Sequence, residues 1–249
     1  MPALRNDAYG SELMAVYRGA SNILEIVERE DNLISTSNWP SRYFGEYSTR
    51  GPLEKQAMRL VKGRVLDIGC GAGRLGLYLQ KKGFEVTGID NSPGAIKVCR
   101  LRGHKKARLM AIADIHRFKK DSFDTILMMG NNFGLFGSYK QAVRLLKEMH
   151  RISSAKGQII AETVNPYSTT EPLHKGYHRL NLRRGRMGGQ LRIRIRHSNI
   201  IGPWFEYLLV SQKEMKRIVQ GTGWRIARIL EGKGPGYTAV LKKDPVTRA

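Results

Sequence analysis

The apolar and polar positions along this 249-residue chain change their rhythm three times. Over residues 7–30, apolar side chains recur every three or four positions. That spacing predicts one or two amphipathic helices, with a break at Gly19. A looser segment over 37–52, rich in turn formers and aromatic residues, leads into a helix predicted over 53–61.

From residue 64 to residue 164, short apolar runs alternate with amphipathic stretches. The runs predict buried strands and the stretches between them predict helices. Strands that alternate with helices favour right-handed crossovers and a parallel sheet covered on both faces. Ser92 followed by Pro93 predicts a capped helix start. The strands are predicted at 64–68, 85–90, 107–113, 124–129 and 158–164, and the helices at 74–82, 93–101 and 139–152.

After Pro166 the pattern becomes that of strands with two different faces. Residues 190–197 alternate strictly and predict a strand that carries isoleucines on one face and arginines on the other. The stretch 205–210 predicts a strand able to pair with it. The chain then predicts a helix over 212–220 and a terminal antiparallel hairpin of two strands, 224–230 and 237–242.

Bulk composition bounds the class of protein. The hydrophobic fraction of 41% is ordinary for a globular domain, and no apolar run approaches the roughly 20 residues that cross a membrane. The first ten residues lack the apolar core of a signal peptide. Cys70 and Cys99 give neither a disulfide framework nor metal-ligand spacing. We therefore expect a soluble cytoplasmic protein with no membrane partner and no metal.

The formal charge is strongly positive, at +22, from 43 Lys and Arg against 21 Asp and Glu. Eight basic residues and no acidic residue lie between Glu171 and Glu206. A field of this sign attracts anions, including nucleic acid. It also improves solubility by itself, and the sequence leaves both interpretations open.

The segment VLDIGCGAGRLG, residues 65–76, predicts a glycine loop between a strand and a helix. A phosphate-binding P-loop would need Lys and Ser or Thr where Arg74 and Leu75 stand. A dinucleotide site would use the glycines together with Asp90, which lies 17 residues after Gly73. However, Asp67 at the end of the strand would repel a pyrophosphate on the loop.

S-adenosylmethionine (SAM) matches these residues better because it carries an ammonium and a sulfonium and no phosphate. Asp67 would engage the ammonium, and the glycines would let the backbone approach the ligand. Asp90 would accept hydrogen bonds from the ribose hydroxyls, and Asp114 from the adenine amino group. Three successive strand ends thus present acids at the carboxyl edge of the predicted sheet.

The segments VLDIGCGAGR, GID (88–90), ADI (113–115) and FDTILMMGNN (123–132) together resemble the successive motifs of class I SAM-dependent methyltransferases. The resemblance implies an α/β fold with a Rossmann-like, seven-stranded, mostly parallel sheet, helices on both faces and an antiparallel last strand. It divides the chain into an N-terminal helical cap over 1–50 and a methyltransferase domain over 51–249, with a basic β segment inserted at about 166–210. It places the Gly130–Asn132 loop beside the transferable methyl group. The residues assigned to SAM and to its product S-adenosylhomocysteine (SAH) are Asp67, Gly69, Cys70, Gly71, Gly73, Asp90, Asn91, Asp114, Ile115, Gly130 and Asn131.

Three aromatic residues, Tyr43, Phe44 and Tyr47, are candidates for a lid over the cofactor or for packing of the N-terminal helices, and Tyr43 is counted with the cofactor residues. Candidates for a catalytic base are His174, His178 and Tyr139. Candidates for binding the substrate are Asn132, Arg192, Arg194, Arg196 and Tyr167. Arginines that line a pocket mouth would select an anionic acceptor, whereas arginines that face solvent would carry no such information.

Cytosine C5 chemistry requires a cysteine nucleophile, and neither cysteine is placed for it. The Asn/Asp-Pro-Pro-aromatic turn of amino-methylating nucleic-acid enzymes is absent after the fourth strand. We expect an enzyme that transfers methyl from SAM to a small polar or anionic metabolite. The alternatives are an RNA or RNA-associated protein methyltransferase and a SAM-binding sensor or scaffold without turnover. RNA and a second copy of the chain stay open as partners.

Overall fold

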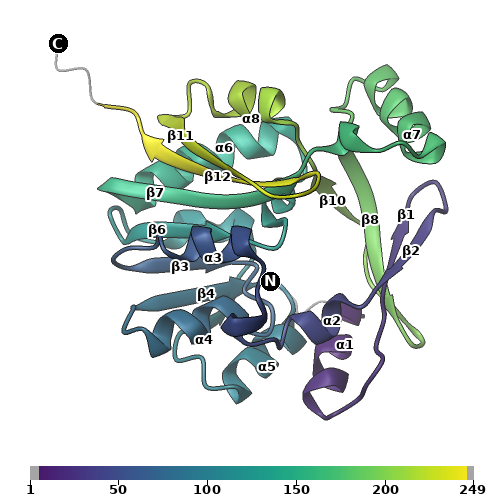
Figure 1. The fold of residues 1–249 in the computed structure, drawn as a ribbon, viewed down its shortest axis with the longest axis horizontal. Coiled ribbons are helices and arrows are strands. Elements are labelled where there is room, and N and C mark those ends of the chain that lie inside the picture. Colours follow the sequence, from purple (N-terminus) through teal and green to yellow (C-terminus); the bar gives the residue numbers. More distant parts are fainter. Residues whose placement is uncertain (1–5, 246–249) are drawn as a thin grey trace. The chain divides into compact units, whose positions relative to one another are not determined.

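The computed structural model describes residues 6–245 (Figure 1). The chain divides into two compact units that interleave along the sequence. Unit 1 holds residues 6–50 together with Leu66–Asp114 and Leu191–Phe205. Unit 2 holds Gly51–Val65, Ile115–Gln190 and residues 206–245.

The larger sheet has seven strands in the order β11-β12-β7-β6-β3-β4-β5. The pairs β4–β5 and β6–β7 are parallel, while β12 runs antiparallel to both β7 and β11. The expected α/β fold, with a mostly parallel sheet and an antiparallel last strand, is confirmed. The strands are β3 (Val65–Ile68), β4 (Val86–Asp90), β5 (Ala107–Leu109), β6 (Phe123–Met128), β7 (Ser153–Val164), β11 (Trp224–Glu231) and β12 (Gly236–Lys243).

Helix starts follow the local signals in the sequence. Ser92 accepts a hydrogen bond from the Ala95 N–H and Pro93 opens the helix, as the sequence predicts. Ser211 and Glu214 form a reciprocal capping box. The helices are α1 (Ala8–Tyr17), α2 (Trp39–Arg42), α3 (Pro52–Met58), α4 (Arg74–Lys81), α5 (Pro93–Leu101), α6 (Tyr139–Ile152), α7 (Pro172–Arg183) and α8 (Gln212–Val219). Short 3-10 turns lie at Tyr47–Thr49, Ile112–Arg117, Asn132–Phe136 and Pro166–Ser168.

A second sheet has the order β10-β8-β1-β2, with β9 paired to β8. Figure 1 shows the β1–β2 hairpin beside the long β8 strand. These strands are β1 (Glu25–Arg29), β2 (Ile34–Ser37), β8 (Gln190–His197), β9 (Ile200–Ile201) and β10 (Phe205–Leu208). The prediction that 205–210 pairs with 190–197 is confirmed.

Two element predictions are corrected by the structure. The second helix expected within 7–30 is wrong, because Glu25–Arg29 forms strand β1 between β2 and β8. Two β-branched residues, Ile26 and Val27, suit an extended pairing, and tertiary contact decides in its favour. The strand expected over 107–113 ends at Leu109, since the chain turns into a 3-10 helix at Ile112.

Candidate functional site

The glycine loop of unit 1 needs glycine for conformational reasons. Gly69, Gly71 and Gly73 have φ of +71°, +51° and +80°, values that other residues rarely adopt. The N–H groups of Gly69 and Cys70 both donate to the carbonyl of Ile89, which ties the loop to the end of β4. The loop is therefore a fixed turn whose backbone is open to close approach.

Asp90 is the acidic centre of this loop. It is 8% exposed, and its two oxygens accept hydrogen bonds from Gly71 N–H (3.0 Å) and Ser92 N–H (2.9 Å). Burial raises the pKa of Asp90 to about 6, against the opposing effect of these two N–H donors. Each oxygen retains a second lone pair, so the carboxylate is still able to accept ribose hydroxyls.

The other cofactor candidates of this unit have different exposure. Asp67 is 3% exposed at the end of β3, Asn91 is exposed beside Asp90, and Asp114 is half-buried in the 3-10 turn after β5. Ile115, the first residue of unit 2, is fully buried. Within unit 1 the structure directly joins Asp90 to the glycine loop.

Helix α1 is a part of this site that the sequence did not indicate. The carboxylate of Asp7 caps α1 at Gly10 N–H (2.9 Å) and also accepts from Ser92 Oγ and Gly94 N–H, both at 2.8 Å. The two backbones touch here, since a Cβ on Gly10 would lie 2.6 Å from the Gly94 Cα. The two residues of this junction are 85 positions apart, so no local sequence pattern indicates it.

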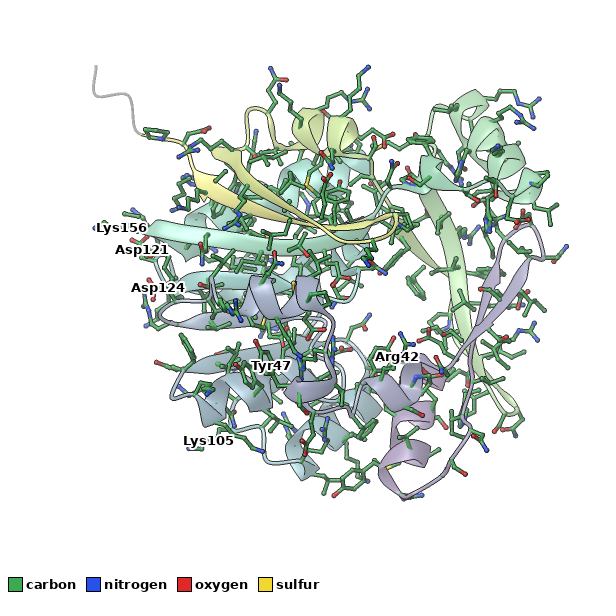
Figure 2. All side chains as sticks on the ribbon, viewed as in Figure 1. Arg42, Tyr47, Lys105, Asp121, Asp124 and Lys156 are labelled. Carbon is green, nitrogen blue, oxygen red and sulfur yellow. The ribbon has the colours of Figure 1, made fainter. Side chains whose placement is uncertain are left out.

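The aromatic residues proposed as a lid have two different roles. Tyr43 packs edge-to-face on Tyr9, with ring centroids 5.9 Å apart, and its hydroxyl donates to Glu25. Tyr47, labelled in Figure 2, instead stacks on Tyr78 at 3.9 Å. Tyr43 therefore belongs to the buried group around α1, and Tyr47 packs on helix α4.

In unit 2, the loop after β6 is conformationally strained. Gly130 and Asn131 both have positive φ, +70° and +64°. The Gly130 N–H donates to the Glu162 carboxylate at 2.8 Å, and the Tyr207 hydroxyl donates to the Asn131 carbonyl at 2.7 Å. The Tyr207 ring fills the space beside Gly134 that a side chain would occupy. Strain held in place by its surroundings is typical of functional loops.

The side-chain oxygen of Asn131 is buried and receives no hydrogen bond from the described residues. Such an orphaned acceptor has a desolvation cost that a ligand donor would remove. The sequence motif identified this loop, but Tyr207 and Glu162, which hold it, lie on other elements and were missed. Asn132, the candidate for substrate contact, opens the 3-10 turn that follows.

The candidate catalytic bases of unit 2 fall into separate places. Tyr139 lies at the start of α6, where the Arg217 guanidinium is 5.3 Å from its ring centre. Tyr167 donates a 2.6 Å hydrogen bond to Glu214, and its ring meets that of His178. His174 lies one turn before His178 on α7. Burial and the bond to Glu214 raise the pKa of Tyr167, the candidate for binding the substrate, so its hydroxyl stays protonated at neutral pH.

The arginines of β8 lie on one face of the strand, as predicted, but a carboxylate of the neighbouring strand partly neutralises their charge. Both Arg194 (2.8 Å) and Arg196 form ion pairs with Glu28 on β1. The guanidinium of Arg194 also lies 4.4 Å from the centre of the Trp204 ring, and that of Arg192 lies 5.9 Å away. Protein groups therefore already satisfy much of the charge that was expected to bind an anion.

The charge and shape of these residues fit a nucleoside with two unblocked ribose hydroxyls. Within unit 1, Asp90 supplies ionisable acceptors and the left-handed glycines expose backbone. A strand-loop-helix site of this kind at the carboxyl end of a strand defines a Rossmann-like nucleoside-binding protein.

Among Rossmann-like nucleoside-binding proteins, the chain is similar to methyltransferases. A family model described as a methyltransferase domain matches residues 65–157. A SAM-dependent methyltransferase of Bacteroides fragilis, solved in complex with SAH, is 26% identical, covers 98% of both chains and superposes with a TM-score of 0.83. These two similarities support a class I SAM-dependent methyltransferase, with the methyltransferase domain model matched over residues 65–157.

Other relatives share only parts of the chain. A tRNA (uracil(54)-C(5))-methyltransferase of Pyrococcus horikoshii is 31% identical over 131 residues, 51% of this chain and 30% of the relative. A ubiquinone biosynthesis O-methyltransferase of Xanthomonas oryzae pv. oryzae is 28% identical over 111 residues, 43% of this chain and 45% of the relative. The chain thus spans less than half the length of these curated relatives. A Methanosarcina mazei SAM-dependent methyltransferase, 20% identical with a TM-score of 0.60 over 78% of this chain and 98% of its own, shares the fold.

Residues 6–245 contain neither a helix that could cross a membrane nor a cluster of side chains that could hold a metal ion. None of the helices there combines the length and the apolar character that crossing a membrane requires. Nor do any three His, Cys, Asp or Glu side chains in that range come together in a way that would hold a metal ion.

Proposed function

We propose that the protein binds SAM at the glycine loop and transfers its methyl group to a small polar metabolite. The observation that carries this proposal is the buried Asp90 carboxylate, fixed by Gly71 and Ser92 and retaining unused lone pairs for a ribose. The full-length similarity to the Bacteroides fragilis enzyme supports the same cofactor.

Different residues of the chain would have different roles in binding the cofactor and the acceptor. Asp90 and the glycine loop hold the nucleoside, and the hydrogen bonds of Asp7 to Ser92 and Gly94 hold α1 beside the loop. Bound SAM supplies an electrophilic methyl group on a sulfonium, so much of the rate enhancement comes from holding the acceptor in line with it. The loop at Asn131 is fixed by hydrogen bonds of its backbone to Glu162 and Tyr207. A loop fixed in this way is consistent with a small acceptor.

The finer expectation of an anionic acceptor has weaker support. Glu28 already pairs with Arg194 and Arg196, which leaves less positive charge to attract a carboxylate or phosphate. A neutral or cationic polar acceptor is more consistent with these ion pairs.

RNA is the second candidate, because the exposed face of α7 is strongly basic. Lys175, Arg179 and Arg183 recur every four residues on exposed positions of this helix. Chemistry at a pyrimidine C5 lacks a suitable nucleophile, however. The hydrogen bond with Cys99, together with burial, raises the pKa of the Cys70 thiol, and Cys99 itself is fully buried.

The test is transfer of labelled methyl from SAM into extract that is afterwards separated into small-molecule, RNA and protein fractions. Label in the small-molecule fraction, lost with Asp90→Ala, supports the proposal. Label in RNA, with an affinity slope of about −0.9 per duplex phosphate or −0.7 per single-strand phosphate against log salt, supports the second candidate instead. SAH binding by calorimetry without label in any fraction identifies a sensor.

A further inference from the structure

A group of acids and phenols lies at helix α1 in unit 1, with one member buried and three half-buried. It consists of Glu12 and Tyr9 from α1, Glu25 from β1 and Tyr43, and we call it the N-terminal carboxylate cluster. The Glu12 side chain is fully buried. No nitrogen and no Ser, Thr or Tyr hydroxyl of the described residues donates to either of its oxygens, and its polar neighbour is the carboxyl of Glu25.

Glu25 is better satisfied, but only by neutral donors. The Tyr43 hydroxyl donates to one oxygen at 3.2 Å, and the Ser37 hydroxyl donates to the other at 3.4 Å. The two carboxyl groups thus lie together, with Glu12 buried and Glu25 half-buried, beside the edge-to-face rings of Tyr9 and Tyr43.

No Lys, Arg or His side chain of the described residues pairs with the carboxyl group of Glu12 or Glu25. The groups that raise the pKa of Glu12 to about 9, after burial itself, are Glu25 and Asp7. Burial raises the pKa of Tyr9, and Tyr43, Asp90, Glu25 and Glu12 raise it further. The charged groups that raise these two pKa values are therefore acidic, in a protein of net charge +22. The Arg102 guanidinium contacts the cluster only through the backbone carbonyl of Tyr43, at 3.4 Å, and not through a carboxylate.

Glu28, three residues after Glu25 on the same strand, provides the contrast. It points to the opposite face of β1 and pairs with both Arg194 and Arg196. Burying carboxyl groups without a partner is costly, and proteins ordinarily place an arginine or lysine beside them. The group missing from the N-terminal carboxylate cluster is a cation.

The cluster is also continuous with the glycine loop. Tyr9 lies one helical turn before Glu12, and its hydroxyl would be 2.7 Å from a Cβ on Gly71. An organic ligand that reached Glu12 would thus lie next to the loop proposed to hold SAM.

We propose that Glu12, Glu25 and Tyr43 form the subsite for an organic ammonium group, the amine end of the methyl acceptor. This inference rests on the proposed function and names its substrate class. When the ammonium enters, it replaces the proton that the two carboxyl groups share, and that proton goes to solvent, so the net charge of the cluster does not change. The phenol of Tyr43 continues to donate to Glu25, and the carboxylate oxygens accept the ammonium hydrogens.

Three probes with one skeleton test the charge preference: phenethylamine, 2-phenylethanol and phenylacetate. Calorimetry with the wild-type protein, with and without SAH, should give about tenfold or tighter binding of phenethylamine than of the alcohol. Glu12→Gln, which mimics the protonated side chain in shape, should remove that preference. Glu85→Gln, at an exposed site in the same unit that pairs with Lys106, should retain it. Equal or tighter binding of the alcohol or of phenylacetate by wild type would overturn the proposal.

Two further readouts separate this ligand from other cations. Titrations in buffers of different ionisation enthalpy should show proton release when phenethylamine binds, and Glu12→Gln should abolish it. If Glu12→Gln weakens binding of SAM but not of SAH, the cluster binds the sulfonium of SAM and the acceptor-amine proposal is wrong. The proposed function has its own test, because it is wrong if the wild-type protein binds neither SAM nor SAH. In that case the probe titrations without SAH still measure whether the cluster prefers the amine.

Discussion

The carboxylate of Asp7 accepts a 2.8 Å hydrogen bond from the hydroxyl of Ser92, the residue that caps helix α5. The backbone N–H of the same Ser92 donates to Asp90, and Asp90 in turn accepts from Gly71. One continuous chain of hydrogen bonds therefore runs from the start of α1 to the glycine loop. Helix α1 is thereby joined by hydrogen bonds to the loop that we propose to hold SAM.

Asp7→Ala should weaken SAM binding about tenfold, because it removes the junction of α1 with α5. It should also cost about 0.5–2 kcal/mol of stability through the lost helix cap. Calorimetry and thermal melting measure the two effects. The matched control is Ser138→Ala, which removes the cap of α6 in unit 2 and should lower stability alone. Equal SAM affinity in both variants would show that α1 does not contribute to the site.

Asp90→Ala should weaken SAM binding by roughly 1.5–3 kcal/mol, the contribution of hydrogen bonds to a charged group. The pKa of Asp90 is raised to about 6, so the carboxylate is ionised above that pH and protonated below it. SAM affinity of the wild type should therefore fall as the pH drops below about 6. Asp90→Asn should bind weakly with no such dependence. Unchanged affinity in Asp90→Ala would remove this residue from the site.

Gly71→Val should abolish SAM binding and leave cooperative melting. The residue has φ of +51°, and its new Cβ would lie 2.7 Å from the Tyr9 hydroxyl. Gly103→Ala is the control in the same unit, since its φ is +94° and no neighbouring atom lies within 4 Å. That variant should lose some stability and bind SAM normally. Binding retained by Gly71→Val would mean that the loop does not contact the ligand.

Tyr207→Phe should lower kcat about tenfold while leaving SAM affinity unchanged. The hydroxyl supports the left-handed backbone of Asn131, whose strain is of order 1–3 kcal/mol. Tyr237→Phe removes a similar buried hydroxyl, which donates to Val210, and should lower stability without this effect on kcat. Steady-state kinetics with SAM measures kcat for both variants. Equal kcat values in Tyr207→Phe and Tyr237→Phe would contradict the role of Tyr207.

Glu12→Gln should stabilise the protein at alkaline pH. The folded-state pKa of Glu12 lies near 9, well above its ordinary value of 4.5, so the protonated form is favoured by folding. The wild type therefore loses stability as pH rises from about 4.5 to about 9, because deprotonation becomes progressively easier in the unfolded chain. Gln cannot ionise, so melting temperatures of the variant should change less over that range. A pH profile identical to that of wild type would show that Glu12 is not held protonated.

The sequence by itself determined the local parts of this protein. Strands β3, β4 and β6, helix α6 and the Ser92 cap follow from periodicity and from side chains that act on adjacent backbone. Because Gly69, Gly71 and Gly73 carry their conformational requirement locally, the motif was visible without the fold.

Tertiary structure decided which distant residues complete those parts. Residues 25–29 form a strand because β2 and β8 offer hydrogen bonds, although their apolar spacing also suits a helix. The junction of Asp7 with Ser92 spans 85 residues, and the support of Asn131 by Tyr207 spans 76. The neutralisation of Arg194 by Glu28 spans 166. No local propensity encodes such contacts, since each depends on chain segments that meet only when the hydrophobic faces of several elements are buried together.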